Sequence, residues 1–299
     1  MAEEVKKSAI FNVLLDKHYK LLLLIPIAML VFSLIYIYSF YNAHGDVMLK
    51  DVTLTGGASI TVHTGKTIDI RDIEKALLPK FKDISSRILT DFSTGEQVAF
   101  SVEANADIED LKLSLEEILG YELTEENSSM EFTGSSLSES FYKEMIIAVI
   151  LAFLMMSIVV FIIFRTFIPC MAVIFAAFSD IAITLAIVDI IGVRVSTAGI
   201  AAFLMLIGYS VDTDMLLTTR VLRRKEKELI ERMTDSMKTG MTMTLTSIIA
   251  VLLGYFIAIS PVLKQVFLII SIGLFVDIIT TWFGNTSMLK WYCDKKGIN

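Results

Sequence analysis

Five aspartates lie inside stretches of sequence that are otherwise almost free of charge: Asp180, Asp189, Asp212, Asp214 and Asp277. Such stretches are about 20 residues long, which is enough for a helix to cross a hydrocarbon core of roughly 30 Å. An aspartate at the centre of such a helix raises the free energy of membrane insertion by about 2.5 to 3.5 kcal/mol, so it is usually retained for a function. A carboxyl group that is neutral when desolvated and charged when wetted can relay protons. We therefore expect a proton relay; the alternative is a set of packing acids that stay protonated or paired.

The five aspartates differ in their position along the apolar runs. Asp189 lies at the end of its run, where a salt bridge to a nearby arginine at the membrane surface explains it, whereas Asp180 and Asp277 lie near the centres of theirs. A step of two residues turns a helical side chain by about 200°, so Asp212 and Asp214 cannot both point into one cavity. We expect Asp212 to be the inward-facing member. The candidates for the relay, in order of preference, are Asp212, Asp180, Asp277 and Asp214.

A small residue precedes each of three candidate acids by one helical turn: Ala176, Gly208 and Gly273. Small residues allow helices to approach closely or leave room for water beside an acid. Hydroxyl groups are also dense at the start of the fifth apolar run, where Thr242 and Thr246 lie. They are expected to bond backbone carbonyls one turn back, or alternatively to line the same polar cavity as the acids.

Composition excludes several classes of protein. The 299 residues are 55% hydrophobic and only 20% charged, an apolar excess over ordinary soluble domains. This argues against a soluble enzyme, a secreted disulfide scaffold and a nucleic-acid binder. The three histidines lie outside the apolar runs, and the two cysteines imply no disulfide framework. We expect no metal site, no cofactor and no catalytic residues.

The apolar runs predict an α-helical polytopic membrane protein with six transmembrane helices. One is residues 21–41 and five lie within residues 141–286. The predicted spans are Leu21 to Tyr41, Met145 to Phe164, Phe167 to Ile190, Val195 to Leu217, Met243 to Leu263 and Gln265 to Thr286.

Basic residues set the predicted orientation, because Lys and Arg in short connections are held on the cytoplasmic side. They are in excess in residues 1–20, 218–242 and 287–299. Both termini and the loop 218–242 are therefore predicted to be cytoplasmic, and residues 42–140 to face outward. The net positive charge of the loop also suits contact with anionic membrane lipid.

Residues 42–140 are predicted to form a small extracytoplasmic α+β domain between the first and second transmembrane helices. Strand patterns cover Leu54 to His63 and Gln97 to Ala104, and a weaker one covers Ile84 to Phe92. Helical spacing of apolar residues follows Ile70 and, after a possible N-cap at Asp107, Ile108. The segment has eight Lys and Arg against nineteen Asp and Glu, a net charge of −11.

Several motifs together resemble SecF, the membrane subunit of the SecDF complex that assists the Sec protein-export channel. The fourth run contains GYSV followed by DTD and a basic exit, a form more like archaeal than bacterial members. The other matching motifs are LTGG at 54–57, VFIIFR at 160–165 and TGMTMTLTS at 239–247.

The resemblance implies one half of a transporter of the resistance-nodulation-division superfamily type, in which protons drive polypeptide export. Its implied partners are SecD, a SecY-type channel and the translocating polypeptide. By this resemblance Asp212 matches the fourth-span acid of the SecD-type motif, and Asp180 matches a third-span SecF acid. Bacterial SecF has Asn-Asp after GYSV and an arginine near position 239. The nearest base here is Lys238, which joins Thr242 and Thr246 as a candidate for lining the polar cavity. Asp277 has no bacterial counterpart.

Three other functions are compatible with acids in membrane helices. The chain could be half of a proton-coupled exporter of small molecules, although a domain of about 100 residues is small for that task. An intramembrane aspartyl protease would need two facing aspartates, for which Asp180 and Asp212 could serve. A structural scaffold would tolerate neutralisation of every acid.

Overall fold

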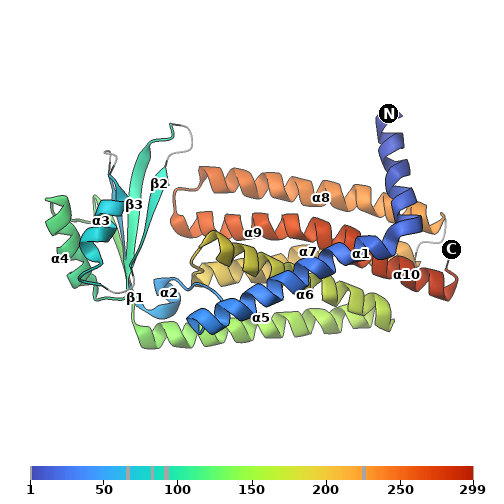
Figure 1. The fold of residues 1–299 in the computed structure, drawn as a ribbon, viewed down its shortest axis with the longest axis horizontal. Coiled ribbons are helices and arrows are strands. Elements are labelled where there is room, and N and C mark those ends of the chain that lie inside the picture. The colour runs from blue at the N-terminus through green and yellow to red at the C-terminus, as the bar shows by residue number, and fades with distance from the viewer. Residues whose placement is uncertain (1, 65–67, 82–83, 91–93, 224–226, 299) are drawn as a thin grey trace.

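The computed structural model describes residues 2–64, 68–81, 84–90, 94–223 and 227–298 of the chain. A small sheet with two helices lies at one end of a long bundle of helices (Figure 1). We call residues 57–133 the sheet domain and the end of the bundle next to it the domain end. The connections at that end include residues 192–196 and 258–260.

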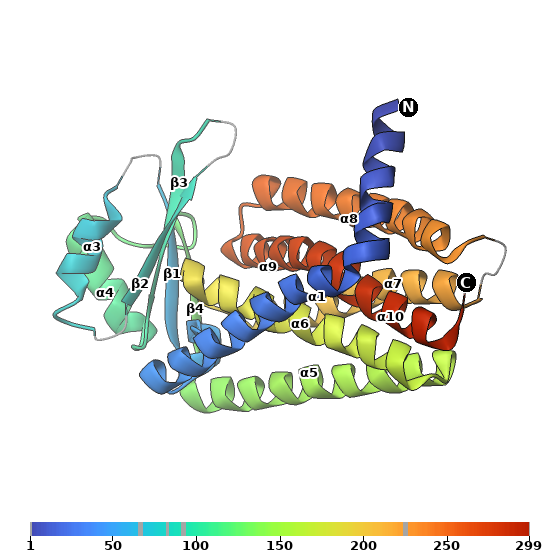
Figure 2. The same cartoon turned by 45° about the vertical axis from the view of Figure 1, so that its right-hand side comes forward.

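Six helical segments in the described part of the chain are long and apolar enough to cross a membrane, as predicted. They are formed by α1 (Ala2–His44), α5 (Ser135–Phe164), α6 (Phe167–Ile191), α7 (Thr197–Arg223), α8 (Leu229–Ile257), and α9 (Pro261–Ile279) with its continuation. Helix α1 breaks at His18, where φ and ψ are −125° and 18°, and its first part turns away from the bundle (Figure 2). The apolar part, from His18 to His44, packs on α6.

The last span contains a π-helix. Helix α9 continues into η1 (Thr280–Asn285) and then into α10 (Thr286–Lys296) without a break in the chain of helical turns. A π-helix has wider turns than an α-helix, and short π segments inside α-helices occur frequently at functional sites. This one is largely buried and contacts both α6 and α7.

Two of the predicted boundaries in the bundle are wrong. The predicted fifth span, Met243 to Leu263, crosses the end of α8 at Ile257, and Pro261 begins the next helix. The predicted loop 218–242 is largely helical, because α7 continues to Arg223 and α8 already begins at Leu229. Charged residues lower the hydropathy of the helix ends at 218–242, so the apolar run ends there. The helices themselves continue through these charged residues.

The sheet domain has four antiparallel strands in the order β2-β3-β1-β4. They are β1 (Gly57–His63), β2 (Ile84–Thr90), β3 (Gln97–Ala104) and β4 (Ser128–Thr133), with helices α3 (Ile70–Leu77) and α4 (Ile108–Leu119) between them. Both helices pack on one face of the sheet. Alternate strand residues such as Ile60, Phe100 and Val102 point to these helices and form the core.

Sequence patterns located three of the four strands. The first predicted strand began too early, because Val52–Thr55 forms the short helix α2 and the strand begins only at Gly57. A Cβ atom at position 57 would overlap the backbone of Ala104, and φ there is +134°, so the position requires glycine. Strand β4 has the sequence SSMEFT and was not predicted.

The second face of the sheet turns toward the domain end of the bundle and is polar. Residues one step out of phase with the core, such as Ser59, Ser101 and Glu103, line it. Strand alternation therefore places an apolar core on one side and a row of hydroxyl and carboxyl groups on the other.

Candidate functional site

Three of the predicted acids meet inside the bundle. Asp180 of α6, Asp214 of α7 and Asp277 of α9 each have 0% of their surface exposed. We call these three residues the membrane cluster. Helices α6, α7 and α9 pack against one another, which brings residues that are far apart in sequence together.

Asp180 accepts hydrogen bonds from two neighbouring helices. The Ser210 hydroxyl of α7 donates to Oδ2 at 2.5 Å, and the Thr280 hydroxyl of η1 donates to Oδ1.

Asp214 is held by the π-helix. Its Oδ1 accepts from the Asn285 amide at 2.6 Å and from the Thr281 hydroxyl at 3.0 Å. The same Thr281 oxygen lies 3.0 Å from Asp277 Oδ1. Because a hydroxyl has one proton, it donates to only one carboxylate at a time, so Thr281 can exchange its bond between Asp214 and Asp277.

In the part of the chain that the structure describes, the membrane cluster has no basic partner. Within the described part of the chain, no ion pair joins Asp180, Asp214 or Asp277 to a lysine or arginine. One oxygen of Asp214 and one of Asp277, the Oδ2 atoms, are buried without a hydrogen-bond donor. Burying several carboxylates without a counter-charge is very unfavourable, so protons must neutralise part of this cluster.

Close helix packing surrounds the membrane cluster at two of the three predicted small residues. Ala176 and Gly273 are buried, and a Cβ atom at position 273 would overlap the Leu206 side chain of α7. Gly208 is different, because it is exposed and a Cβ atom there would meet nothing within 4 Å. The expectation that Gly208 packs beside the relay is wrong within this chain.

The expected facing of the fourth-span acids is also wrong. Asp214 is fully buried and Asp212 is exposed on the outside of the bundle. The two-residue step separates them as predicted, but the packing of α7 selects the opposite phase: Ser210, Thr213 and Asp214 are buried together. Asp212 therefore does not face Asp180, and the pair proposed for a protease is not formed.

Three polar side chains of α8 that could have lined the cavity of the acids lie elsewhere. Lys238, Thr242 and Thr246 are exposed on the bundle surface. The Thr242 hydroxyl donates to the Lys238 carbonyl at 2.8 Å, and the Thr246 hydroxyl to the Thr242 carbonyl at 2.9 Å. The expectation of bonding within the helix is confirmed, whereas the expectation that these three residues line the cavity of the acids is wrong.

Asp189 has a structural role that differs from the predicted salt bridge. Its Oδ1 accepts from the Leu49 backbone N–H at 3.1 Å, and this fixes the segment that follows α1. No ion pair in the described residues joins it to Arg194.

Sequence reasoning missed four residues of the site: Ser210, Thr280, Thr281 and Asn285. Three of them follow Asp277 in the run TTWFGN, where a polar amide and two hydroxyls interrupt the last apolar span. This interruption is the feature of the sequence that could have indicated these site residues. Among the described residues, no group of three or more His, Cys, Asp or Glu side chains is arranged to hold a metal ion.

The chain is similar in sequence to known membrane proteins. Residues 116–295 match the family model described as protein export membrane protein SecD/SecF, C-terminal. A SecF of Methanocaldococcus jannaschii is 36% identical over 92% of this chain and 96% of its own. A SecF of Methanothermobacter thermautotrophicus is 36% identical over 98% of this chain and 99% of its own.

A solved structure shares the fold. The crystal structure of SecDF, a translocon-associated membrane protein from Thermus thermophilus, superimposes with a TM-score of 0.72 over 92% of this chain at 17% identity. The chain spans only 38% of that SecDF chain, so it corresponds to one part of the longer protein. With membrane helices, a small antiparallel sheet, and this similarity to SecF proteins along nearly the whole sequence, the chain belongs to the SecD/SecF family of protein-export membrane proteins.

Proposed function

We propose that the chain is an accessory subunit of the Sec protein-export machinery, which pairs with SecD and uses the proton motive force to promote polypeptide export. The single observation that carries the proton coupling is the membrane cluster: three fully buried carboxyls, held by hydroxyl and amide groups and without a basic partner among the described residues. A proton that crosses 100 mV releases about 2.3 kcal/mol, enough to shift a two-state equilibrium some fiftyfold.

The π-helix links the protonation of the membrane cluster to movement of the helices. Thr280 bonds Asp180, while Thr281 and Asn285 bond Asp214. Protonation of Asp180 or Asp214 weakens the hydrogen bonds that the side chains of η1 donate to that carboxyl. Helix η1 also contacts α1. We propose that η1 shifts relative to α6 and α7 when the cluster exchanges a proton.

The orientation in the membrane is part of the proposal. We place residues 1–20 and 287–299 in the cytoplasm, with the sheet domain inserted between the first and second spans and outside the membrane. The basic residues in the short connections support this orientation. Outside, the sheet domain is where an emerging polypeptide would meet this subunit, next to a SecY-type channel.

We also propose that SecD packs against the polar face of α7 and α8. Asp212, Lys238 and Thr242 lie on helices of membrane-spanning length yet are exposed in this chain. An aspartate that faced lipid would be costly, so a protein partner accounts for this face better than hydrocarbon does.

The test of the proton coupling is Asp214→Asn, reconstituted with SecD and the channel in vesicles. The substitution keeps the size of the side chain and removes its ability to exchange a proton. We expect assembly to be retained and gradient-dependent stimulation of export to be lost. Asp235→Asn is the matched control, because Asp235 is a half-exposed α8 residue that pairs with Lys227 outside the cluster. It should leave stimulation unchanged.

Normal stimulation in assembled Asp214→Asn would contradict the proposal. Imposing a proton gradient and a sodium gradient separately tests the coupling ion. We expect stimulation with the proton gradient alone, since the cluster is lined by carboxyl, hydroxyl and amide groups already bonded to one another.

A further inference from the structure

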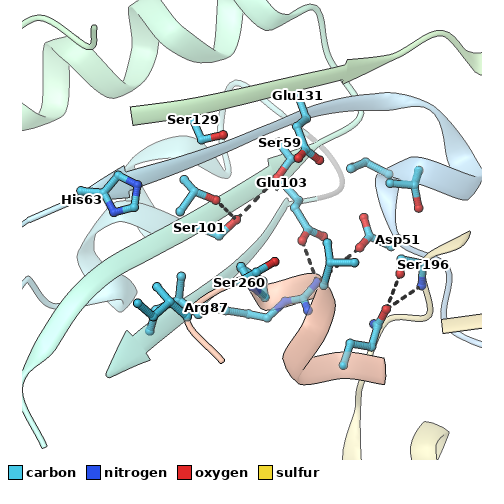
Figure 3. A pocket seen from close by; sticks show the side chains of 18 residues that line it. Asp51, Ser59, His63, Arg87, Ser101, Glu103, Ser129, Glu131, Ser196 and Ser260 are labelled. Carbon is cyan, nitrogen blue, oxygen red and sulfur yellow. Dashed lines mark hydrogen bonds and ion pairs between the residues drawn. The ribbon is translucent and has the colours of Figure 1, made fainter. Parts of the chain in front are cut away.

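A second group of buried charges lies outside the membrane bundle, where the sheet domain rests on it. A cavity of about 220 Å³ separates the polar face of the sheet from the domain end of the bundle (Figure 3). Asp51, Arg87 and Glu103 meet at one side of this cavity, and we call these three residues the seat triad. The cavity rim includes His63, which is exposed, so water reaches the cavity from outside.

The segment that contains Asp51 is attached to the bundle by hydrogen bonds. Its backbone N–H donates to the Val195 carbonyl at 2.9 Å, and the Val195 N–H donates to the Leu49 carbonyl at 2.7 Å. The Thr197 N–H, at the start of α7, donates to the Thr53 hydroxyl at 3.2 Å. The segment around Asp51 is thereby fixed to the connection between α6 and α7.

Arg87 and Glu103 belong to the sheet. They lie on the neighbouring strands β2 and β3, and Arg87 Nη2 lies 2.7 Å from Glu103 Oε1. The same nitrogen lies 3.8 Å from Asp51 Oδ2. A further polar contact between sheet and bundle, from Lys264 Nζ to the Thr90 carbonyl, is long at 3.5 Å. Among the described residues, Arg87 and Asp51 thus form the ion pair that joins the sheet domain to the bundle, and Lys264 with Thr90 is a second polar contact between the two parts.

The two carboxyls of the seat triad are buried and incompletely partnered. Glu103 is 6% and Asp51 9% exposed. One oxygen of each, Glu103 Oε2 and Asp51 Oδ1, has no hydrogen-bond donor. Both carboxyl groups lie beside the same nitrogen, Arg87 Nη2, at 2.7 Å from Glu103 and 3.8 Å from Asp51. Two neighbouring carboxyl groups can hydrogen-bond to each other only if one of them carries a proton.

Burial, together with the charges around Glu103, favours its protonated form on balance. Burial, followed by the charge of Asp51, raises the pKa of Glu103 from 4.5 to about 7, although Arg87 and Arg194 act in the opposite direction. One guanidinium thus faces two carboxyl groups at short range. The other titratable groups that line the cavity are His63 of β1 and Glu131 of β4, both exposed at its rim.

We propose that Asp51 and Glu103 form a proton-binding site that holds the sheet domain on the bundle. With one proton shared between the carboxyls, a single negative charge faces Arg87 and the sheet domain is held against the bundle. We call this state the closed seat, and the state in which the sheet domain moves away from the bundle the open seat. When that proton leaves to water in the cavity, two carboxylates face each other and the seat loosens. This site is separate from the membrane cluster and goes beyond the proposed function.

The direction of the pH dependence follows from proton linkage. The closed seat binds more protons than an open one between the ordinary value of 4.5 and about 7. Its stability is therefore fully present below pH 4.5 and is lost as the pH rises through 7. Between pH 5 and pH 8 the ratio of open to closed seat should rise by on the order of tenfold to a hundredfold.

The test measures the distance between the sheet domain and the bundle in the full chain, in lipid nanodiscs, with a pair of spin labels. Suitable sites are Glu109→Cys on α4 and Ile191→Cys at the end of α6, both exposed. The two native cysteines are buried and are replaced by alanine. We expect the distance distribution to broaden as the pH rises from 5 to 8, with a midpoint near 7.

Glu103→Gln should abolish this pH response and keep the seat closed, because a neutral amide can donate to Asp51 at every pH. Glu131→Gln, the same change at an exposed carboxyl of the same cavity, should leave the response intact. A distribution that is identical at pH 5 and pH 8 in the labelled chain without either substitution would overturn the proposal. So would a response that persists in Glu103→Gln.

The measurement needs neither SecD nor transport. A spin-label distance that does not depend on pH would therefore leave the export proposal unaffected. Normal export stimulation in Asp214→Asn would likewise leave the proposal for the seat triad unaffected.

Discussion

Carboxyl groups are buried at two levels of this protein, and the surroundings differ. In the membrane cluster, Asp180, Asp214 and Asp277 accept hydrogen bonds from hydroxyl and amide groups, and no described lysine or arginine forms an ion pair with them. In the seat triad, Asp51 and Glu103 meet a guanidinium beside a water-accessible cavity. Without a cation, the first group depends on protons for its neutrality, whereas the second can remain charged at a cost. We therefore propose that carboxyl groups hold a proton in the membrane cluster and control the attachment of the sheet domain in the seat triad.

The largest effect that would sharpen this contrast is expected from Arg87→Met. Removing one partner of a fully buried ion pair costs about 3 to 5 kcal/mol. Because the Arg87 side chain is 32% exposed, we expect the lower figure of about 2 to 3 kcal/mol. The loss should be smaller at pH 5 than at pH 8, since protonation relieves the repulsion between Asp51 and Glu103. Thermal unfolding of the full chain at both pH values measures it.

An equal loss at pH 5 and pH 8 in Arg87→Met would show that the carboxyls of the seat triad do not titrate together. Glu131→Gln serves as the control, with no expected change in unfolding temperature at either pH.

The next effect concerns packing around the membrane cluster. Gly273→Ala introduces a methyl group into the space of Leu206 and should destabilise the bundle by about 1 to 3 kcal/mol. Gly208→Ala adds the same group where nothing lies within 4 Å and should be neutral or slightly stabilising in the isolated chain. The difference between the two unfolding temperatures in detergent checks it. Equal effects would mean that α7 and α9 do not pack as described.

The smallest effect is expected from a single hydroxyl. Thr281→Val keeps the shape of the side chain but removes the donor shared by Asp214 and Asp277, and should cost about 1 to 2 kcal/mol. Thr246→Val is the matched control, because that hydroxyl bonds only carbonyls of its own exposed helix face. A larger loss in Thr246→Val than in Thr281→Val would contradict a hydrogen-bonded membrane cluster.

The sequence predicted the six membrane helices because long apolar runs have few alternative structures. It predicted the strands with clear alternation, such as Gln97–Ala104, but not the edge strand Ser128–Thr133, whose polar residues face the cavity or solvent. Edge strands are stabilised by their neighbour more than by their own side chains, so composition identifies them poorly.

Within the site, the sequence identified the acids but not their phase. Asp212 and Asp214 are equally consistent with an inward helix face until the packing of Ser210 and Thr213 is known. The π-helix changes the side-chain period in the last span, so a regular helical projection from Asp277 does not reveal that Asn285 reaches Asp214. A threonine also lowers the hydropathy of a span much less than a charged residue does, so hydropathy does not identify Thr280 and Thr281 as site residues.

The central claim is that the membrane cluster holds a proton that its own residues share. Infrared spectroscopy of the full chain in lipid at pH 8 tests this most directly, because the carboxyls of the seat triad are then expected to be ionised. We predict a protonated-carboxyl C=O band that is shifted or lost in each of Asp180→Asn, Asp214→Asn and Asp277→Asn, and unchanged in Asp235→Asn. A band that none of the three cluster substitutions alters would contradict the account.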